Sequence, residues 1–216
     1  MKHLNPIHAI KKSLFVFFLF AMVITIAIKS EKLIAAEDPI IMLKGATERL
    51  MDVLRKNKET LKSNPGRIYS IVNEYVLPYT DFEEMSKWVV GRNAWNEASL
   101  ETRNQFIKEF KTMVVNAYAK SLLAYSDQTI EFLPERQNSQ GRVQVSSVIR
   151  GGERGPLRID YRMIQAGNSW KVYDIIIEGV SLMQGYRSQF SEDVSGGGMD
   201  AVVEKLQQHN ARKAQG

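Results

Sequence analysis

Cysteine is absent from the 216-residue sequence, and histidine occurs only at positions 3, 8 and 209. Without cysteine the chain has no disulfide bond, no thiolate metal site and no lipoprotein processing at a cysteine. Two of the histidines lie in the N-terminal segment, and His209 lies in a polar stretch near the C-terminus. The central part of the chain therefore lacks a base for Ser-His-Asp or Cys-His catalysis and lacks most ligands of transition metals.

Nucleotide-binding and nucleophile motifs are missing as well. Residues 151–155 are rich in glycine, but no Gly-Lys-Ser/Thr follows them, so they predict a turn and not a P-loop. Residues 179–183 begin like a nucleophile elbow, yet the closing glycine is absent, and Ser181 is better explained as a helix N-cap. The sequence thus gives no positive indication of an enzyme, and it implies no cofactor and no metal.

Two acidic residues leave one catalytic alternative open. Asp174 and Glu178 could share a strand face, close enough in principle for acid–base chemistry. The simpler interpretation is that Asp174 hydrogen-bonds Tyr161 or pairs with an arginine. A hydrolase of lipids or esters that uses Ser181 or this carboxylate pair is one alternative function. A chaperone-like binder of apolar protein segments is another.

Positive charge is scarce outside the N-terminal segment. The formal net charge is +5, but residues 1–36 contain five lysines and one glutamate and so account for +4 of it. The rest of the chain therefore carries only +1. A nearly neutral body gains little from counterion release on nucleic acid, so we expect no nucleic-acid partner.

The N-terminal segment has the three parts of a secretory signal peptide. Basic residues at positions 2–12 precede an uncharged apolar stretch at 14–28, and Ala35-Ala36 suits signal peptidase. The alternative is a retained membrane anchor, but the apolar stretch falls short of the roughly 20 residues that span a bilayer. We expect residues 1–36 to be cleaved on export to the periplasm. Residues 37–216 then form a single domain with a polar C-terminal tail after about residue 209.

Apolar residues spaced three or four apart predict a helical first half. The predicted helices cover residues 39–58, 65–76, 80–90 and 99–125. Thr80-Asp-Phe-Glu83 has the form of a capping box, Gly91 can end the third helix, and Ser99 opens the fourth and longest.

The hydrophobic period changes to two from Ile130 onwards, which predicts half-buried strands. Four strands are predicted, around residues 130–132, 143–149, 157–163 and 170–178. Short turns between them indicate an antiparallel meander. A tight turn at 166–169 would place Ile159 opposite Ile176 and Met163 opposite Val172. Two amphipathic helices, 180–190 and 198–209, follow the strands and are separated by glycines 196–198.

Three stretches together resemble the MlaC family, the periplasmic phospholipid-binding proteins of the system that maintains outer-membrane lipid asymmetry. The family is also called the toluene-tolerance auxiliary proteins. The similarity covers about residues 39–210. The stretches that carry it are Leu77-Pro-Tyr-Thr-Asp-Phe-Glu83 through Val90-Gly-Arg-Asn-Ala-Trp95, Trp170-Lys-Val-Tyr-Asp-Ile-Ile-Ile-Glu-Gly-Val-Ser-Leu182, and Tyr186-Arg-Ser-Gln-Phe190.

The resemblance implies an α+β fold, in which about six helices and a curved four-stranded antiparallel sheet surround an apolar cavity. It also implies a carrier that moves phospholipid between the inner and outer membranes without catalysis. The implied partners are an inner-membrane ABC transporter with an MCE-domain protein and an outer-membrane lipoprotein–porin complex. We further expect a monomer.

The expected cavity lies between the long helix, the helix at 82–90 and the inner face of the sheet. Methionines suit such a lining because their side chains adapt to acyl tails of variable length. Apolar stripes of this kind also build ordinary cores, so the pattern alone does not separate a filled interior from a hollow one. The residues expected to line the cavity are Phe82, Met85, Phe110, Val114, Tyr118, Ile149, Ile159, Tyr161, Met163, Val172 and Ile176.

Overall fold

The computed structural model of the protein describes residues 37–124, 128–151 and 155–214. Residues 36–216 form one compact unit. The predicted signal peptide, residues 1–36, lies outside the described residues. In the described part of the chain, no helix has the length and apolar character needed to cross a membrane. The α-helices are α2 (Pro39–Lys56), α3 (Lys58–Ser63), α4 (Ile68–Tyr75), α5 (Phe82–Val90), α6 (Arg92–Glu97), α7 (Leu100–Tyr118) and α8 (Leu182–Ala214).

The sheet is an antiparallel meander in the order β1-β2-β3-β4-β5, and it confirms the predicted α+β class. Four of its strands are the predicted ones, and the fifth is a two-residue strand that the sequence did not reveal. The predicted tight turn is confirmed, because Ala166 pairs directly with Ser169. The strands are β1 (Thr129–Ser139), β2 (Arg142–Arg150), β3 (Leu157–Ala166), β4 (Ser169–Ile177) and β5 (Val180–Ser181).

A bulge in the β3–β4 ladder changes the predicted pairing. Met163 lies opposite Val172 as predicted, but the register shifts between Arg162 and Met163. Beyond the bulge Ile159 lies opposite Ile177, so the predicted pairing of Ile159 with Ile176 is wrong. The extra residue of a bulge moves every later side chain of that strand to the other face. Sequence alternation alone could not show where that residue is inserted.

The N-terminal caps of two helices can be compared with prediction. Ser99 caps α7 as predicted, since its hydroxyl accepts a hydrogen bond from a backbone amide three residues later, at 3.0 Å. The predicted cap at Thr80 is wrong, because the Asp81 carboxylate caps α5 and accepts from the Glu84 amide at 2.9 Å. Thr80 instead forms a parallel bridge with Val172 of β4. The start of α5 is thereby tied to the sheet.

Two further helix boundaries differ from prediction. α7 ends at Tyr118 and continues as a 3₁₀-helix to Ala124, so the regular helix is shorter than expected. The two predicted C-terminal helices are continuous through the first glycines and break at Gly198, where φ is 65°. Within the expected polar tail the helix continues to Ala214, and the Asn210 side chain donates to the Glu109 carbonyl at 3.0 Å.

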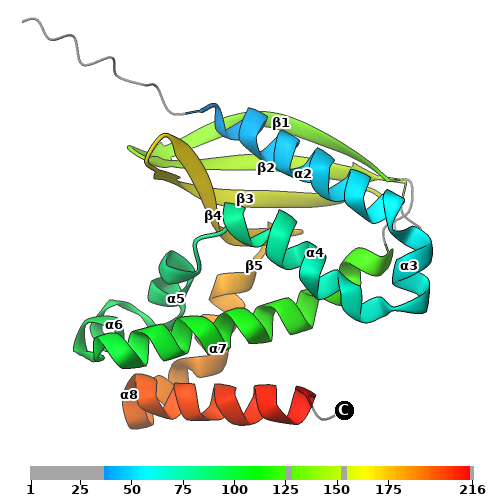
Figure 1. Cartoon of the computed structure of the whole chain (residues 1–216). Coiled ribbons are helices and arrows are strands. Elements are labelled where there is room, and N and C mark those ends of the chain that lie inside the picture. The colour runs from blue at the N-terminus through cyan, green and yellow to red at the C-terminus, as the bar shows by residue number, and fades with distance from the viewer. Residues whose placement is uncertain (1–36, 125–127, 152–154, 215–216) are drawn as a thin grey trace, which may run out of the picture. The chain divides into compact units, whose positions relative to one another are not determined.

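Buried apolar side chains form three separate clusters. In Figure 1 the sheet and α2 lie at one end, α7 and α8 lie at the other, and α4 lies between them. The sheet cluster contains Met42, Leu43, Val143, Val145, Met163, Trp170 and Val172. The α4 cluster contains Leu54, Leu61, Ile68, Ile71, Val72 and Ala119. The α7–α8 cluster includes Met85, Phe106, Phe110, Met113, Tyr173, Phe190, Val202 and Leu206.

Candidate lipid-binding site

The sheet face that packs against α2, here called the α2 face, presents four rows of side chains that run across the strands. Side chains that are directly opposite in neighbouring strands point to the same face. Row 1 is Val143, Met163 and Val172, with Gln137 of β1 opposite Val143; row 2 is Val145, Tyr161 and Ile175; row 3 is Phe132, Ser147, Ile159 and Ile177; row 4 is Ile130, Ile149 and Leu157.

Burial falls from the first of these rows to the last. Row 1 lies under α2, and Met163 in it is fully buried. Row 2 keeps Val145 buried, but its other two members are only partly covered. All three residues of row 4 are partly exposed, although each is apolar. A sheet face that is apolar along its length yet covered at one end only leaves hydrocarbon surface available for a ligand.

The path of α2 explains this gradient. Its first half contributes Met42 and Leu43 to the sheet cluster, whereas its second half contributes Leu54 to the α4 cluster. α2 therefore leaves the sheet after about two turns and packs against α4 instead. Apart from Phe132, which packs against the sheet cluster, rows 3 and 4 lie beyond it.

One residue of α2 marks where the helix and the sheet separate. Leu43, Ala46, Leu50 and Leu54 follow one another at intervals of three or four and so share one helix face. Leu43, Ala46 and Leu54 are 6%, 7% and 4% exposed, whereas Leu50 between them is only half-buried. Leu50 packs against the α4 cluster but keeps accessible surface where α2 leaves the sheet.

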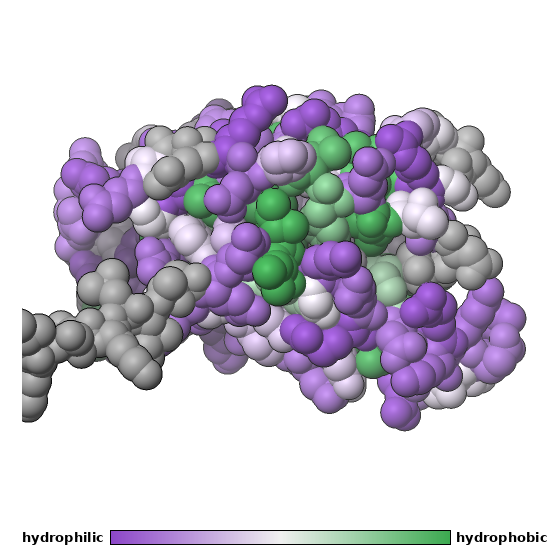
Figure 2. Space-filling model, turned by 90° about the horizontal axis from the view of Figure 1, so that it is seen from above, coloured by the Kyte–Doolittle hydropathy of each residue, from purple (hydrophilic) through white to green (hydrophobic). Residues whose placement is uncertain are grey.

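The surface on this side of the molecule agrees with these observations. Figure 2 looks onto the side that is uppermost in Figure 1, where α2 and β1 lie. Apolar side chains gather in the middle of the face inside a frame of polar ones, and the surface is hollowed between them. An apolar recess with a polar rim is typical of a site for a molecule with a hydrocarbon body and a polar end.

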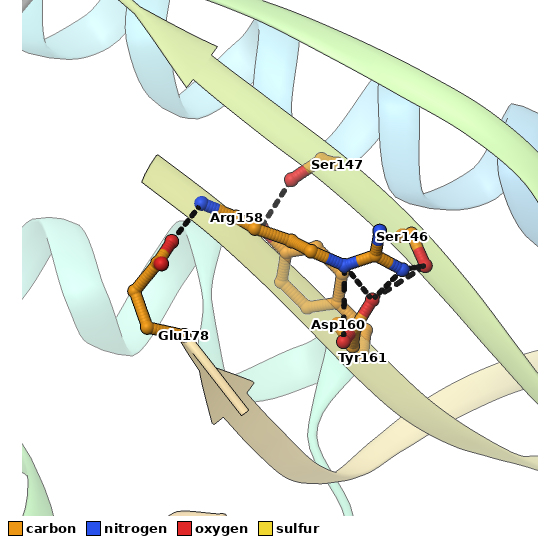
Figure 3. A network of polar contacts seen from close by, with 6 residues as sticks. All are labelled: Ser146, Ser147, Arg158, Asp160, Tyr161 and Glu178. Atoms are coloured by element: carbon orange, nitrogen blue, oxygen red, sulfur yellow. Dashed lines mark hydrogen bonds and ion pairs between the residues drawn. The ribbon is translucent and has the colours of Figure 1, made fainter. Parts of the chain in front are cut away.

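Two hydroxyl groups interrupt the apolar rows. Ser147 is fully buried, and its hydroxyl donates to the phenol oxygen of Tyr161 at 3.4 Å, a long hydrogen bond (Figure 3). The Tyr161 side chain keeps accessible surface, yet burial raises the pKa of its phenol. The side chain is therefore largely shielded from water but not fully packed.

The opposite face of the same strands carries a polar network around Asp160. Arg158 donates to the Asp160 carboxylate at 3.0 Å and to the Ser146 hydroxyl at 3.1 Å (Figure 3). Burial by itself would raise the pKa of Asp160, but hydrogen bonds from Ser146 and Arg158, with the charges of Arg158 and Arg136, outweigh it and lower that pKa. This network stabilises the outer face of the sheet and takes no part in the apolar recess.

The predicted lining residues do not all lie together. Tyr161, Met163, Val172, Ile149 and Ile159 lie on the α2 face. A second group belongs to the α7–α8 cluster or packs against it, namely Phe82, Met85, Phe110 and Val114. In that cluster Phe110 is 0% exposed, and its ring stacks on Phe106 with 5.5 Å between ring centroids.

Two predicted residues are members of neither group. Tyr118 is 39% exposed at the end of α7, and its side chain hydrogen-bonds that of Tyr186, which packs against the α7–α8 cluster. Ile176 lies opposite Asp160, on the polar side of the sheet, because the bulge reverses the faces of β4. Its neighbours Ile175 and Ile177 take its place on the α2 face. The run Ile175-Ile-Ile177 signalled an apolar strand end, but only the position of the bulge decides which of the three face α2.

A family model for MlaC proteins matches residues 44–208. The chain belongs to the MlaC family. One relative is the toluene tolerance protein ttg2D of Pseudomonas putida, which is 28% identical over 167 residues, covering 77% of this chain and 78% of that protein. Another is the intermembrane phospholipid transport system binding protein MlaC of Haemophilus influenzae, which is 26% identical over 197 residues, covering 89% and 91%.

A solved structure of a relative also matches this MlaC-family chain. It is a phospholipid-binding protein from Ralstonia solanacearum in complex with a phospholipid, with a TM-score of 0.74 and 28% sequence identity. The match covers 82% of this chain and 99% of the other.

The catalytic alternatives do not assemble into a site in this family member. Ser181 caps α8: its hydroxyl accepts from the Gln184 amide at 3.0 Å and donates to Asp174 at 2.7 Å. Asp174 is 2% exposed and also pairs with Arg162 at 3.2 Å, as the simpler interpretation predicted. Glu178 accepts from a backbone amide of β3. Both carboxylates are thus engaged in holding the end of the sheet.

A metal site and the pocket between α7 and α8 are less well supported as functional sites than the α2 face. Among the described residues, no group of three or more histidine and carboxylate side chains is placed to hold a metal ion. A pocket of about 270 Å³ lies between α7 and α8, and its lining includes Met113 and Phe190 together with charged residues such as Lys205. Its volume is below the roughly 300–1,000 Å³ typical of ligand sites. A phospholipid with two long tails does not fit there.

Proposed function

We propose that this protein is a periplasmic phospholipid carrier that shelters acyl tails in the space between α2 and rows 2–4 of the α2 face. The observation that supports this most directly is the half-exposed apolar surface of those rows, such as Ile149 and Ile159, in a folded domain. A relative of the same family, similar over 82% of this chain, was solved with a phospholipid bound.

The energetics favour a hollow apolar interior over any catalytic machinery. A phospholipid with some 30 methylene groups would lose roughly 24 kcal/mol if it crossed water without cover, at about 0.8 kcal/mol per methylene. A shuttle has to offset most of that loss by contact with apolar side chains. It needs no nucleophile, no base and no metal ion, in keeping with the side chains present on the α2 face.

The proposal extends to location and partners. Residues 1–36 direct export and are removed, and the mature domain is a monomer that carries lipid between the inner and outer membranes. An inner-membrane ABC transporter with an MCE-domain protein and an outer-membrane lipoprotein–porin complex are the proposed exchange partners. The family membership and the name of the relative from Haemophilus influenzae support this placement.

Recovery of the cargo tests the proposal. The full chain is expressed in a Gram-negative host, purified from the periplasm without detergent, and extracted with organic solvent for mass spectrometry. We expect intact phospholipid and a mature protein that begins near residue 37. Protein that holds no lipid and takes none from vesicles would refute the carrier function. Fatty acid released from labelled phospholipid would favour the hydrolase, and lipid-free protein that retains apolar peptides would favour the chaperone.

A pair of matched variants locates the site. In Ile159→Asp a carboxylate faces the proposed space, and because an ionised group is strongly disfavoured next to hydrocarbon, lipid recovery should fall severalfold. Ile41→Asp places the same charge on the outer side of α2, where Ile41 is already 64% exposed, and recovery should not change. Equal recovery from both variants would exclude the α2 face as the site.

A further inference from the structure

In rows 2–4, Tyr161 and Ser147 are the only polar residues among those named. Tyr161 lies in row 2, between Val145 and Ile175, at the boundary between the packed row under α2 and the half-exposed rows beyond it. Phenylalanine at this position would present the same ring and bury no hydroxyl. The hydroxyl therefore needs an explanation in terms of a hydrogen bond.

The internal hydrogen bond of Tyr161 does not use its proton. Ser147 donates to the phenol oxygen at 3.4 Å, so Tyr161 acts as the acceptor in that contact. A phenol carries one donor in addition to its acceptor sites. Among the hydrogen bonds of the described residues, none has the Tyr161 hydroxyl as its donor. A donor that is shielded from water and has no acceptor is unfavourable, so a bound molecule that supplied one would be favoured.

The chemistry of a phospholipid narrows the choice of acceptor. Its tails contain none, and its phosphate is charged and disfavoured in a water-poor space. The ester carbonyls that join the tails to glycerol are neutral acceptors. Because burial raises the pKa of Tyr161, its phenol stays protonated at neutral pH and remains a donor.

We propose that Tyr161 donates a hydrogen bond to an ester carbonyl of the bound lipid, so that the protein prefers ester-linked to ether-linked phospholipids. This inference rests on the proposed carrier function and adds the class of lipid that the site selects. An ether oxygen at the same place lacks the carbonyl, so an ether lipid leaves the donor of Tyr161 unpaired. Ser147 acts as a positioning residue that orients the phenol.

A competition experiment tests the inference. Lipid-free protein is incubated with vesicles that contain equal amounts of diester and diether phosphatidylglycerol with matched tails, and the ratio of the bound lipids is measured by mass spectrometry. We expect a preference for the diester of about fivefold, equivalent to about 1 kcal/mol. Tyr161→Phe keeps the ring and should bind both lipids with a ratio near one.

A matched control separates this effect from the general loss of a tyrosine hydroxyl. Tyr79 accepts a hydrogen bond from Arg49 at 2.6 Å and packs at the edge of the sheet cluster, so Tyr79→Phe should keep the fivefold preference. Equal uptake of both lipids by the unmodified protein, or a preference that persists in Tyr161→Phe, would overturn the role of Tyr161. Failure to take up either lipid would instead overturn the carrier function.

Discussion

Substitution of Ile159 by tryptophan tests whether the space beside row 3 is empty in the lipid-free protein. Ile159 is half-buried on the α2 face, next to Ser147 and Ile177, and no member of the sheet cluster covers it. A larger side chain at this position should extend into the space without displacing a neighbour. We therefore expect the free energy of unfolding of the lipid-free protein to change by less than 1 kcal/mol, because no packed contact is broken.

The same substitution should weaken lipid binding by an amount that can be worked out. The added indole takes the place of roughly two or three methylene groups of the tail, at about 0.8 kcal/mol each, so binding loses about 2 kcal/mol. A loss of this size corresponds to a dissociation constant about 30-fold higher. Titration of the lipid-free variant with a fluorescent phospholipid measures this constant.

Val145→Trp provides the control in the same sheet. Val145 is 0% exposed in row 2 and belongs to the sheet cluster, so a tryptophan there overpacks the interior and should lower the free energy of unfolding by about 1–3 kcal/mol. Urea unfolding of both lipid-free variants measures the difference. If Ile159→Trp is as destabilised as Val145→Trp and binds lipid normally, row 3 is part of a filled core and the site lies elsewhere.

Three further predictions concern stability. Leu54→Ala should lower the free energy of unfolding by about 2–5 kcal/mol and Leu50→Ala by clearly less, because Leu54 is 4% exposed whereas Leu50 is only half-buried. Equal losses in urea unfolding would contradict this. The stabilisation from the lowered pKa of Asp160 is present above its unfolded pKa of about 3.9 and is lost as the pH falls through the folded pKa. Asp160→Asn should therefore be less stable than the unmodified protein at pH 7 and should lose less stability on acidification. Parallel curves of stability against pH for the two proteins would refute this prediction. Gly198→Ala should lower stability by roughly 1–2 kcal/mol because the φ of Gly198 is 65°. Gly196 lies in helical backbone with open space at the Cβ position, so Gly196→Ala should raise stability by about 0.5–1 kcal/mol. Thermal unfolding shows whether the two substitutions change stability in opposite directions.

Local patterns predicted much of the fold. A hydrophobic period of two over 143–149 and 157–163 identified β2 and β3, and a helical period over 39–58 identified α2 within two residues of its observed end. These predictions succeed because an amphipathic element carries its own periodicity, whatever it packs against. The turn at 166–169 and the cap at Ser99 are equally local, because the residues that form them are neighbours in the chain.

Predictions that needed a position along a ladder were less reliable. The sequence showed that Ile175, Ile176 and Ile177 form an apolar strand end, but a single extra residue in β4 decides which of them face α2. Similarly, the aromatic stripe of α7 was expected to line a cavity, whereas Phe110 packs inside the α7–α8 cluster. A stripe of apolar side chains has the same appearance in a sequence whether it faces a helix, a sheet or a hollow.

The sequence by itself determined the longer secondary structure elements but not α3, α6 or β5. It also determined the antiparallel order of the main strands, the missing catalytic groups and the resemblance to the MlaC family. These properties depend on residue identity and on neighbours in the chain. Only the tertiary structure decided that α2 leaves the sheet before Leu50 and that rows 3 and 4 stay partly uncovered. A cavity cannot be recognised from residue identities, because its size depends on the distance between elements that are far apart in the chain.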